Sequence, residues 1–469
     1  MSALYKSLPT FCRVVAEAKP TPDSDIKLEV WLPASGWNGK LQGIGNGGFA
    51  GQIDATTLSL ALKVGYAAAA TDAGHTGGTS AFAVGHPEKV IDFGHRGIHE
   101  MTRVAKAVVQ AYYSKTPQHS YFAACSDGGR EALMEAQRYP EDYDGILAGA
   151  PANNWTPLLT TAAYDTQALT LDPASFIPPA KIPTIAAAVN AACDELDGVR
   201  DGILNDPRQC HFDPATIQCK GEDSDKCLTA VQVTTLNKLY RGTPDSKGQI
   251  VFPGYVPGAE DGQGGWGLWI TGQAPGRSAM AFFGRGFFSD FVYAKPDWDF
   301  KGFQVDADLK AATEKTAQAL NATDPNLSAF QARGGKLILY HGWNDPAITA
   351  LNTINYYGSV IKKMGEKNVD SFVRLYLAPG VQHCLGGPGP SSFGQVVEPG
   401  VTDPQRSMDL SLEQWVEKGT APTTIIASKF EGQDRIHAVM TRPLCPYPQS
   451  AKYKGTGDTN DAANFTCTK

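Results

Sequence analysis

Short apolar runs that alternate with helical patterns constrain the fold of this chain more than any other feature. Segment 97–114 carries an apolar stripe at helical spacing, and 131–138 predicts a further helix. The apolar runs, each bounded by Gly, Pro or polar residues, are 27–33, 40–45, 65–71, 120–125 and 145–149. Runs this short are typical of buried parallel strands. Their alternation with helices predicts an α/β protein with a doubly wound sheet.

The alternation stops near residue 155 and returns after residue 330. The intervening stretch is rich in Pro, Gly, Asp and Cys, and it contains clusters of aromatic residues. Strand patterns reappear at 336–340 and 372–377, and a last strand is expected at 423–427. We therefore expect a discontinuous catalytic domain, 1–155 and 331–469, interrupted by an inserted lid domain at 156–330.

Charge and hydropathy argue against nucleic acid and membranes as partners. The formal net charge is -7, and Lys and Arg form no dense patch. No run of about 18 apolar residues is present, so no transmembrane helix is expected. The chain opens MSALYKSLPT, which lacks the apolar core of a signal peptide.

The nine cysteines favour an oxidising compartment. Cys-x-x-Cys spacing is absent, which argues against zinc. Three pairs lie close in sequence, as short disulfide loops would: Cys193 with Cys210, Cys219 with Cys227, and Cys445 with Cys467. The odd count leaves one thiol over, which we expect to be Cys12. We predict a secreted or periplasmic protein whose signal peptide is absent from this sequence. Reduced, buried cysteines are the alternative.

Ser126 is the candidate nucleophile. It follows the strand expected at 120–125 and precedes a helix, within Ala124-Cys125-Ser126-Asp127-Gly128. A serine on a sharp strand-to-helix turn is exposed for attack, and small neighbours allow the turn. Ala124 stands where the usual Gly-x-Ser-x-Gly pattern has its first glycine. A structural turn that happens to hold a serine is the alternative.

Asp345 and His383 complete a candidate catalytic triad in the order Ser, Asp, His. Asp345 follows the strand expected at 336–340, and His383 follows the strand at 372–377. Catalytic groups gather at the carboxyl ends of such strands. His341 lies nearer its strand and is expected to be structural. Each of these residues on its own has a structural alternative, as a turn cap or a surface loop residue.

Cysteines flank two members of this triad. Cys125 precedes Ser126, and Cys384 follows His383. If the serine and histidine approach to hydrogen-bond distance, Cys125 and Cys384 come close enough for a disulfide. A thiol-dependent hydrolase with Cys125 as nucleophile is the rival interpretation.

The Cys-Ser, Asp and His-Cys constellation resembles the tannase and feruloyl esterase family, which also contains an esterase of mono(2-hydroxyethyl) terephthalate. The similarity extends to the segments 37–40, 45–51, 71–75, 125–130, around Cys193 and 383–389. It implies an α/β-hydrolase fold with a large lid and no organic cofactor. It also implies an oxyanion hole built from the backbone N–H groups of Asp127 and Gly48. Ala124 and Cys12 depart from the family pattern.

The resemblance also implies a structural calcium site in the lid, next to Cys193. Calcium prefers about six to eight oxygen ligands. The similar family segment assigns them to the carboxylates of Asp194, Asp197 and Asp201 and the carbonyls of Val199 and Ile203. A metal-free Asp-Gly turn is the alternative.

The substrate expected from the resemblance is an ester of a hydroxycinnamic acid such as ferulate, for example from plant cell walls. Tannase activity on gallate esters comes second, and hydrolysis of a terephthalate monoester third. Candidate substrate contacts in the lid are Trp269, Phe283, Phe287 and Phe291, with Arg277 and Arg285 available for a carboxylate. A non-catalytic binding protein on a decayed hydrolase fold is the alternative of another class.

Overall fold

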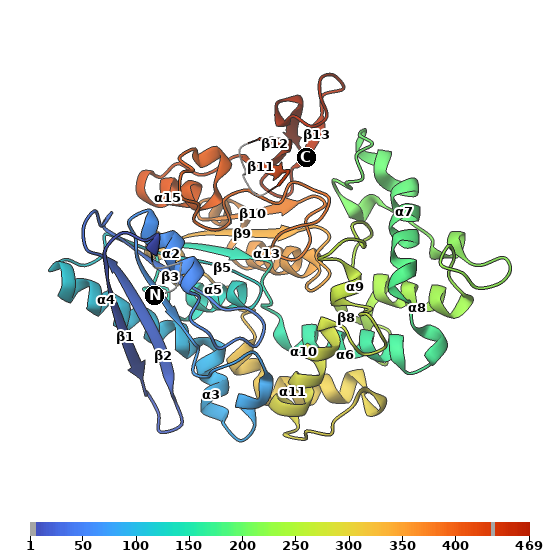
Figure 1. The fold of residues 1–469 in the computed structure, drawn as a ribbon, viewed down its shortest axis with the longest axis horizontal. Helices are drawn as coiled ribbons and strands as arrows, with labels where there is room; N and C mark the ends of the chain where they lie inside the picture. The colour runs from blue at the N-terminus through green and yellow to red at the C-terminus, as the bar shows by residue number, and fades with distance from the viewer. Residues whose placement is uncertain (1–5, 433–436) are drawn as a thin grey trace.

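The computed structural model describes residues 6–432 and 437–469. Its centre is an eight-stranded sheet in the order β1-β2-β4-β3-β5-β6-β9-β10 (Figure 1). The strands are β1 (Phe11–Ala18), β2 (Ile26–Pro33), β3 (Lys40–Ile44), β4 (Ala67–Thr71), β5 (His119–Cys125), β6 (Gly145–Gly149), β9 (Lys336–Gly342) and β10 (Val373–Ala378). Strands β3 to β10 of this sheet run parallel, and β2 runs antiparallel to both of its neighbours.

The five parallel strands expected between 27 and 149 are present, with one difference of direction. The run at 27–33 forms β2, which is antiparallel to β1 and β4 rather than parallel to its neighbours. The sequence interpretation also missed β1, whose side chains are mostly exposed or half-buried. β1 lies at the sheet edge and is joined to β2 by a short connection, so its residues need not form a buried apolar run.

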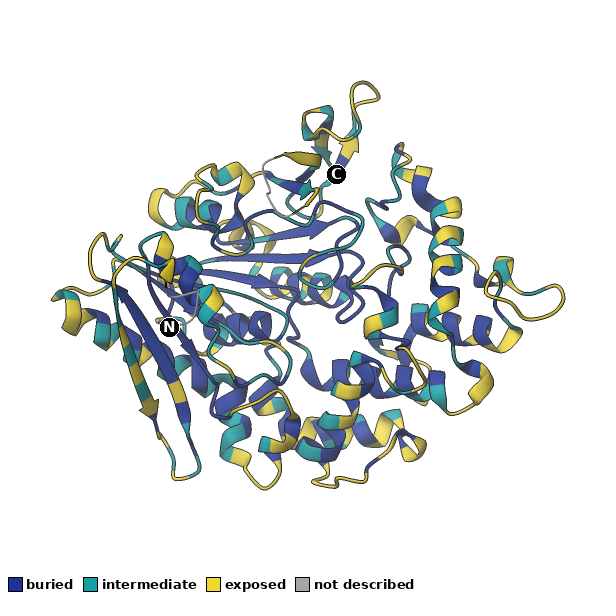
Figure 2. Ribbon diagram, in the orientation of Figure 1, coloured by how far each residue is buried: buried dark blue, intermediate teal, exposed yellow. Residues whose placement is uncertain are grey.

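Helices cover both faces of the sheet. On one face, apolar side chains of α4 (Gly97–Tyr113), α5 (Asp127–Arg138) and α13 (Ala350–Met364) form a core with strand residues such as Phe122. On the other face, α2 (Ala55–Lys63) and α15 (Met408–Lys418) pack on residues such as Tyr121 and Ile338. Two of the inner strands, β4 and β6, are accordingly buried at every residue (Figure 2). This arrangement confirms the predicted α/β fold class.

The segment between β6 and β9 contributes no strand to the main sheet. It lies beside the sheet (Figure 1), with a core of its own around Leu236 and a second core, around Phe288, that it shares with residues such as Phe93. Its elements are α6 (Trp155–Thr170), α7 (Ile182–Cys193), α8 (Ala230–Arg241), β7 (Gly242–Pro244), β8 (Ile250–Pro253), α9 (Trp266–Trp269), α10 (Ala279–Gly286), α11 (Val305–Leu320) and α12 (Ser328–Ala332). The domain boundaries at 155/156 and 330/331 stay a prediction.

The C-terminal region differs from the sequence expectation. The strand predicted at 423–427 forms β11 (Ile425–Phe430), which pairs with β12 (Ala438–Leu444) in a separate two-stranded sheet. A second small sheet joins β13 (Ser450–Tyr453) to β14 (Phe465–Thr468).

The remaining short α-helices are α3 (Pro87–Ile91) and α14 (Glu366–Asp370). Among the described residues, no helix has the length and apolar character needed to cross a bilayer.

All four predicted disulfides are present: Cys125–Cys384, Cys193–Cys210, Cys219–Cys227 and Cys445–Cys467. Cys12 has a free thiol, as predicted. Cys12 lies on β1, where it is half-buried against the core of the α4 face.

We expect Leu339→Ala to destabilise the fold by about 2–5 kcal/mol, because Leu339 is fully buried in β9 and its truncation leaves a cavity. The matched control is Leu171→Ala at the end of α6, where the side chain is 62% exposed and the expected change is within about 0.5 kcal/mol. Urea unfolding of the oxidised protein measures both. Equal losses would show that β9 does not belong to the core.

Candidate active site

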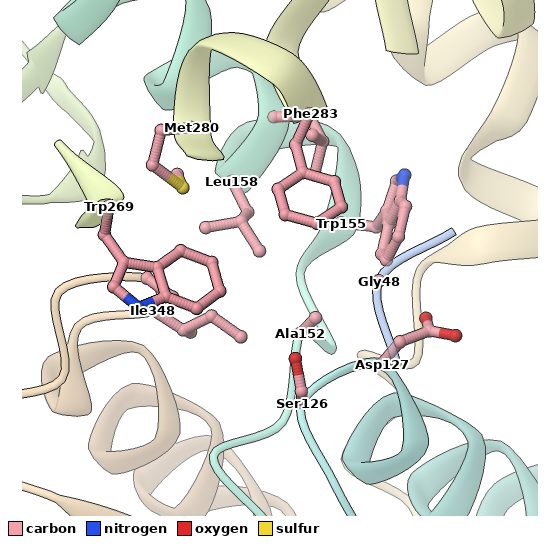
Figure 3. Close-up of a pocket in the computed structure, with 12 residues that line it drawn as sticks. Gly48, Ser126, Asp127, Ala152, Trp155, Leu158, Trp269, Met280, Phe283 and Ile348 are labelled. Carbon is pink, nitrogen blue, oxygen red and sulfur yellow. The ribbon is translucent and has the colours of Figure 1, made fainter. Parts of the chain in front are cut away.

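Ser126 lies at the turn from β5 into α5, with φ of 68° and ψ of -124°. Few residues other than glycine adopt a positive φ, so this serine has an unusual backbone conformation. The sharp turn also brings neighbouring residues close together, so their side chains must be small. A Cβ on Gly128 would lie 2.5 Å from the Cβ of Ala124 and 2.7 Å from the carbonyl oxygen of Asn46. Glycine is therefore required at 128, and alanine is accommodated at 124. The turn directs the Ser126 hydroxyl into a cavity (Figure 3).

The three predicted triad residues meet at hydrogen-bond distance. The Ser126 hydroxyl lies 2.8 Å from Nε2 of His383, and Nδ1 of His383 lies 2.7 Å from Oδ2 of Asp345. Because Asp345 accepts hydrogen bonds as a carboxylate, His383 donates through Nδ1–H and leaves Nε2 free to accept the serine proton. This is the protonation pattern that a serine nucleophile requires.

Asp345 is fully buried as a side chain, yet its surroundings favour the charged form. Oδ1 accepts the backbone N–H groups of Ala347 and Ile348 at 2.8 and 2.9 Å. Burial alone would raise the pKa of Asp345, but His383 and His341 outweigh it and hold that pKa below its usual range. The carboxylate therefore stays ionised beside His383.

His341 has the structural position expected from the sequence. Its Nε2–H donates to the carbonyl of Ile348 at 2.7 Å and lies 3.2 Å from Oδ2 of Asp345. Its Nδ1 lies 2.8 Å from the hydroxyl of Thr353. Because both ring nitrogens of this fully buried side chain are engaged, His341 fixes the Asp345 loop rather than facing the cavity.

The Cys125–Cys384 disulfide joins the serine loop to the histidine loop across 259 residues of sequence, with a Cα–Cα distance of 6.0 Å. The bond lies immediately beside both Ser126 and His383. It also removes the rival interpretation, because a sulfur held in a disulfide is not available as a thiolate nucleophile. Cys125 therefore holds the serine loop to the histidine loop and does not act as the nucleophile.

The two predicted oxyanion donors, Gly48 and Asp127, line the same cavity as Ser126. Asp127 is the first residue of α5, so its N–H has no acceptor within the helix. Its carboxylate turns away from the serine (Figure 3) and pairs with Arg130 at 2.6 Å. Gly48 has φ of 59°, a conformation that favours glycine.

Sequence reasoning missed the side chain that holds the glycine loop, Glu131. Its Oε2 accepts the backbone N–H of Asn46 at 2.8 Å, and Oε1 lies 3.3 Å from the Asn46 side-chain amide. The Asn46 carbonyl in turn accepts the N–H of Gly128 at 2.8 Å. The first turns of α5 thus hold both backbone groups of Asn46, two residues before Gly48. A buried Glu within a helix carries no signal of this contact in the sequence.

Arg130 is a second missed residue. It is fully buried, ion-paired with Asp127, and bonded to the carbonyls of Phe93 and Gly94. The guanidinium also lies over the ring of Phe93, at 4.9 Å from its centroid. The carboxylate of Asp127 is thereby neutralised next to the cavity, where an unpaired charge would oppose a developing anion.

The cavity beside Ser126 is apolar and draws its walls from both parts of the chain (Figure 3). Trp269 and Phe283, both predicted substrate contacts, line it, and Trp269 lies edge-on to the His383 ring with 4.8 Å between centroids. The remaining lining residues, besides Gly48, Ser126 and Asp127, are Ala152, Trp155, Leu158, Leu159, Met280, Ala347 and Ile348.

Four predicted substrate contacts do not line this cavity. Phe287 and Phe291 lie in the π-helical turn that follows α10 and are buried in the same core as Phe49. Arg277 is exposed on a loop. Arg285 is exposed on α10, where it lies over Phe300 and donates to the carbonyl of Trp298 at 3.3 Å. Aromatic clustering alone did not separate core residues from lining residues.

The aspartates predicted to bind calcium lie in one loop clipped by Cys193–Cys210. Asp194 and Asp197 accept the N–H groups of Gly202 and Val199 at 2.8 and 3.0 Å, respectively. Asp201 accepts the N–H of Ile203 at 3.1 Å and pairs with Arg442. Burial and the neighbouring Asp201 and Asp194 raise the pKa of Asp197 to about 6. Among the described residues, the only close group of metal-type ligands is Cys219, Asp223 and Cys227, whose sulfurs form a disulfide.

The fold and the serine site are those of an α/β hydrolase, and comparison with known proteins gives the family. A family model described as tannase and feruloyl esterase matches residues 12–468. An uncharacterized esterase of Xanthomonas campestris pv. campestris is 40% identical, over 98% of this chain and 85% of that protein. The mono(2-hydroxyethyl) terephthalate hydrolase of Piscinibacter sakaiensis is 34% identical, over 99% of this chain and 86% of that protein. The chain belongs to the tannase and feruloyl esterase family.

A solved structure agrees with this assignment. The crystal structure of feruloyl esterase B from Aspergillus oryzae superposes with a TM-score of 0.91, at 29% identity, over 98% of this chain and 91% of its own. These relatives are esterases and hydrolases by name. The protein is accordingly a carboxylic ester hydrolase, and the alternative of a non-catalytic binding protein is not supported.

The contact between Glu131 and Asn46 generates a pH-dependent prediction. Burial, and then the nearby Asp127, raise the pKa of Glu131 to about 8. An unfolded glutamate titrates near about 4.3, so the folded state binds more protons between these two values. The free energy of unfolding should therefore fall as the pH rises through this window. We expect Glu131→Gln, which cannot ionise, to show a smaller fall in urea unfolding at pH 5 to 8.

Glu131→Ala is the companion variant. It leaves the buried N–H of Asn46 without an acceptor and should cost about 1–3 kcal/mol at pH 6, more than the isosteric Gln. A Gln variant with the native dependence on pH would show that Glu131 does not titrate in this window.

Proposed function

We propose that this esterase hydrolyses esters of hydroxycinnamic acids such as ferulate through a covalent acyl-enzyme on Ser126. The observation that carries the proposal is the Ser126–His383–Asp345 chain of hydrogen bonds at the mouth of an apolar pocket with aromatic walls. The relative named feruloyl esterase B, which shares nearly the whole fold, supports the acyl group.

His383 takes the proton of the Ser126 hydroxyl through Nε2 as the oxygen attacks the ester carbonyl. Asp345 holds the ring through Nδ1–H and stabilises the imidazolium that forms. The N–H groups of Gly48 and Asp127 donate to the oxyanion, and they are positioned before the charge develops. His383 then gives the proton to the leaving alcohol. Water, activated in the same way, releases the acid from Ser126.

The lining of the pocket distinguishes three candidate acyl groups. A terephthalate monoester carries a carboxylate that calls for a cation, but Arg277 and Arg285 lie outside the pocket. Gallate carries three hydroxyls, and in the pocket away from Ser126 they would face Leu158, Leu159 and Met280 without partners. A ferulate ring is less polar, and Trp269 and Phe283 offer it aromatic contacts. We therefore propose that the enzyme prefers hydroxycinnamate esters as substrates over gallate and terephthalate esters.

Calcium is proposed as a structural ion in the loop of Asp194, Asp197 and Asp201, with the carbonyls of Val199 and Ile203 as further ligands. The donor set is suitable, because three carboxylates lie in one short loop, where burial and the neighbouring carboxylates raise the pKa of Asp197. In this structure the three carboxylates do not all lie within 4.8 Å of one another. Calcium would stabilise the fold and take no part in ester hydrolysis.

We also propose that the protein works in an oxidising compartment, secreted or periplasmic. Four disulfides support this, and one of them adjoins both Ser126 and His383.

The substrate proposal is tested by measuring kcat/KM for methyl ferulate, methyl gallate and a terephthalate monoester. We expect methyl ferulate to be preferred by at least about 10-fold, which corresponds to about 1.4 kcal/mol of differential binding in the transition state. Ser126→Ala should retain the fold and lose at least about 10³-fold in kcat.

A preference for the gallate or terephthalate ester would overturn the acyl assignment while retaining the mechanism. Turnover by Ser126→Ala at the native rate would overturn the mechanism. Circular dichroism of the variant, compared with the native protein, shows that the fold is kept.

The calcium proposal is tested by thermal unfolding after treatment with EDTA. Ions at about 100 times their dissociation constant stabilise a fold by about 2.7 kcal/mol, so Tm should fall by a few degrees in EDTA and recover with calcium. Asp197→Asn should remove the calcium-dependent part of Tm. A Tm that responds neither to EDTA nor to added calcium would contradict the site.

A further inference from the structure

A buried amide side chain precedes each of two triad residues. Asn344 precedes Asp345, and Gln382 precedes His383. The two amide residues are 5% and 1% exposed, respectively. Neither side chain lines the apolar pocket beside Ser126, and neither belongs to the chain of hydrogen bonds that links the triad. Two buried amides thus lie next to the reacting groups without taking part in the proton transfers.

Asn344 ties the loop after β9 to the loop 257–261, which belongs to the segment between β6 and β9. Its side-chain nitrogen donates to the carbonyl oxygens of Pro257 and Gly258, at 3.0 and 2.7 Å. Its side-chain oxygen accepts the N–H of Gly380, in the loop after β10, at 3.2 Å. Because an amide nitrogen carries two protons, both donors of Asn344 are used on the loop 257–261.

Gln382 makes the matching contact from the loop after β10. Its side-chain nitrogen donates to the carbonyl oxygens of Ala259 and Asp261, both at 2.8 Å. Both donors of this amide are therefore also used on the loop 257–261. Four of the five consecutive carbonyls in this loop thus accept hydrogen bonds from the residues that precede the triad aspartate and histidine.

The loop 257–261 has the backbone conformation that these contacts require. Gly258 has φ of 107°, and a Cβ at this position would lie 2.9 Å from the side-chain nitrogen of Asn344. Ala259 also has a positive φ, of 54°. Between them and Asp261, the buried Glu260 accepts the N–H of Gly258 and, from α8, the hydroxyl of Tyr240, both at 2.8 Å. The loop is therefore held between α8 and the loops of the triad.

This loop leads directly to an aromatic wall of the pocket. The N–H of Trp266, the first residue of α9, donates to the carbonyl of Glu260 at 2.8 Å. α9 ends at Trp269, whose ring lines the pocket and lies edge-on to the ring of His383. The contacts that begin at the residue before His383 therefore return, through α9, to His383 itself.

We propose that Gln382 and Asn344 are positioning residues that set the preference for an aromatic acyl group, because they hold Trp269 in place at the pocket. This inference rests on the proposed hydrolysis of aromatic esters and adds residues that determine acyl selectivity. A ring that is already fixed costs no ordering when the acyl group binds, whereas a ring without a fixed position must be ordered at that moment. An acetyl group offers no ring to Trp269 and depends on the triad and the oxyanion donors alone.

The test compares kcat/KM for methyl ferulate and methyl acetate, two esters of the same alcohol. Gln382→Met keeps nearly the size of the side chain and removes both donors. We expect this variant to lower the ratio of kcat/KM for the ferulate to that for the acetate by at least about 10-fold.

Gln395→Met is the matched control and should leave this ratio within about twofold of the native value. Gln395 also donates to two carbonyls, those of Cys384 and Ser391, at 3.4 and 2.8 Å. Both of these carbonyls belong to the loop after β10, so Gln395 does not bond to the loop 257–261 through them.

Trp269→Ala shows whether the effect acts through the indole ring. It should lower the same ratio, and Gln382→Met should lower it by less than about a further twofold in that background, because changes to one shared contact are not additive. Gln382→Asn is shorter by one methylene, and it tests the contact if Gln382→Met does not fold. Asn344→Leu, which is of similar size, should change the ratio in the same direction. Circular dichroism and urea unfolding show which variants are folded.

Three results would overturn the inference. If Gln382→Met keeps the native ratio, the ring is held in place without this amide. If the variant lowers kcat/KM for both esters in parallel, the amide supports the triad loops and does not affect acyl selectivity. If its effect multiplies with that of Trp269→Ala, the amide acts independently of the ring.

Failure of the proposed function gives a different result. A native enzyme that hydrolyses methyl gallate or the terephthalate monoester in place of methyl ferulate has another acyl preference. Because these acyl groups also carry a ring, the same variants are then compared on that ester and methyl acetate, and the ratio still tests Gln382 and Asn344. A native enzyme that hydrolyses none of the three aromatic esters would overturn both proposals.

Discussion

The buried negative charge of Asp345 is the constraint on which the site depends. A carboxylate removed from water is stable only when its oxygens are fully paired. Here the partners come from the loop after β9, through the N–H groups of Ala347 and Ile348, and from the loop after β10, through His383. Satisfying this single charge therefore fixes the two loops relative to each other. The ring of His383 is turned toward Ser126 as a consequence.

The parallel sheet explains why these loops meet at all. β5, β6, β9 and β10 are neighbours, so the carboxyl ends of the strands that carry Ser126, Asp345 and His383 lie along one edge. The loops at the strand ends supply the polar catalytic residues but few of the apolar walls of the pocket. The apolar walls around the serine come largely from the segment between β6 and β9, through residues such as Leu158, Trp269 and Phe283. Reaction chemistry and substrate fit are thus encoded in different parts of the chain.

Much of this could be predicted from the sequence, for identifiable reasons. The buried strands stand out because they are short and apolar, and Ser126, Asp345 and His383 stand out because each follows such a strand. The direction of β2 and the existence of β1 could not be predicted from the sequence, because both depend on strand pairing at the sheet edge. Glu131 and Arg130 were missed because they act through contacts with loops distant in sequence. Phe283 and Phe287 are the same residue type four positions apart, but Phe283 lines the pocket from α10, whereas Phe287 is buried in the π-helical turn that follows.

The disulfide between Cys125 and Cys384 can form only late in the synthesis of the chain. During synthesis Cys384 leaves the ribosome 259 residues after Cys125, when the serine loop and the whole inserted segment have already been made. Until then the serine has neither its base nor the sulfur that anchors its loop. A nascent chain therefore cannot complete the triad until translation is nearly finished, and only then can the disulfide that joins the serine and histidine loops form.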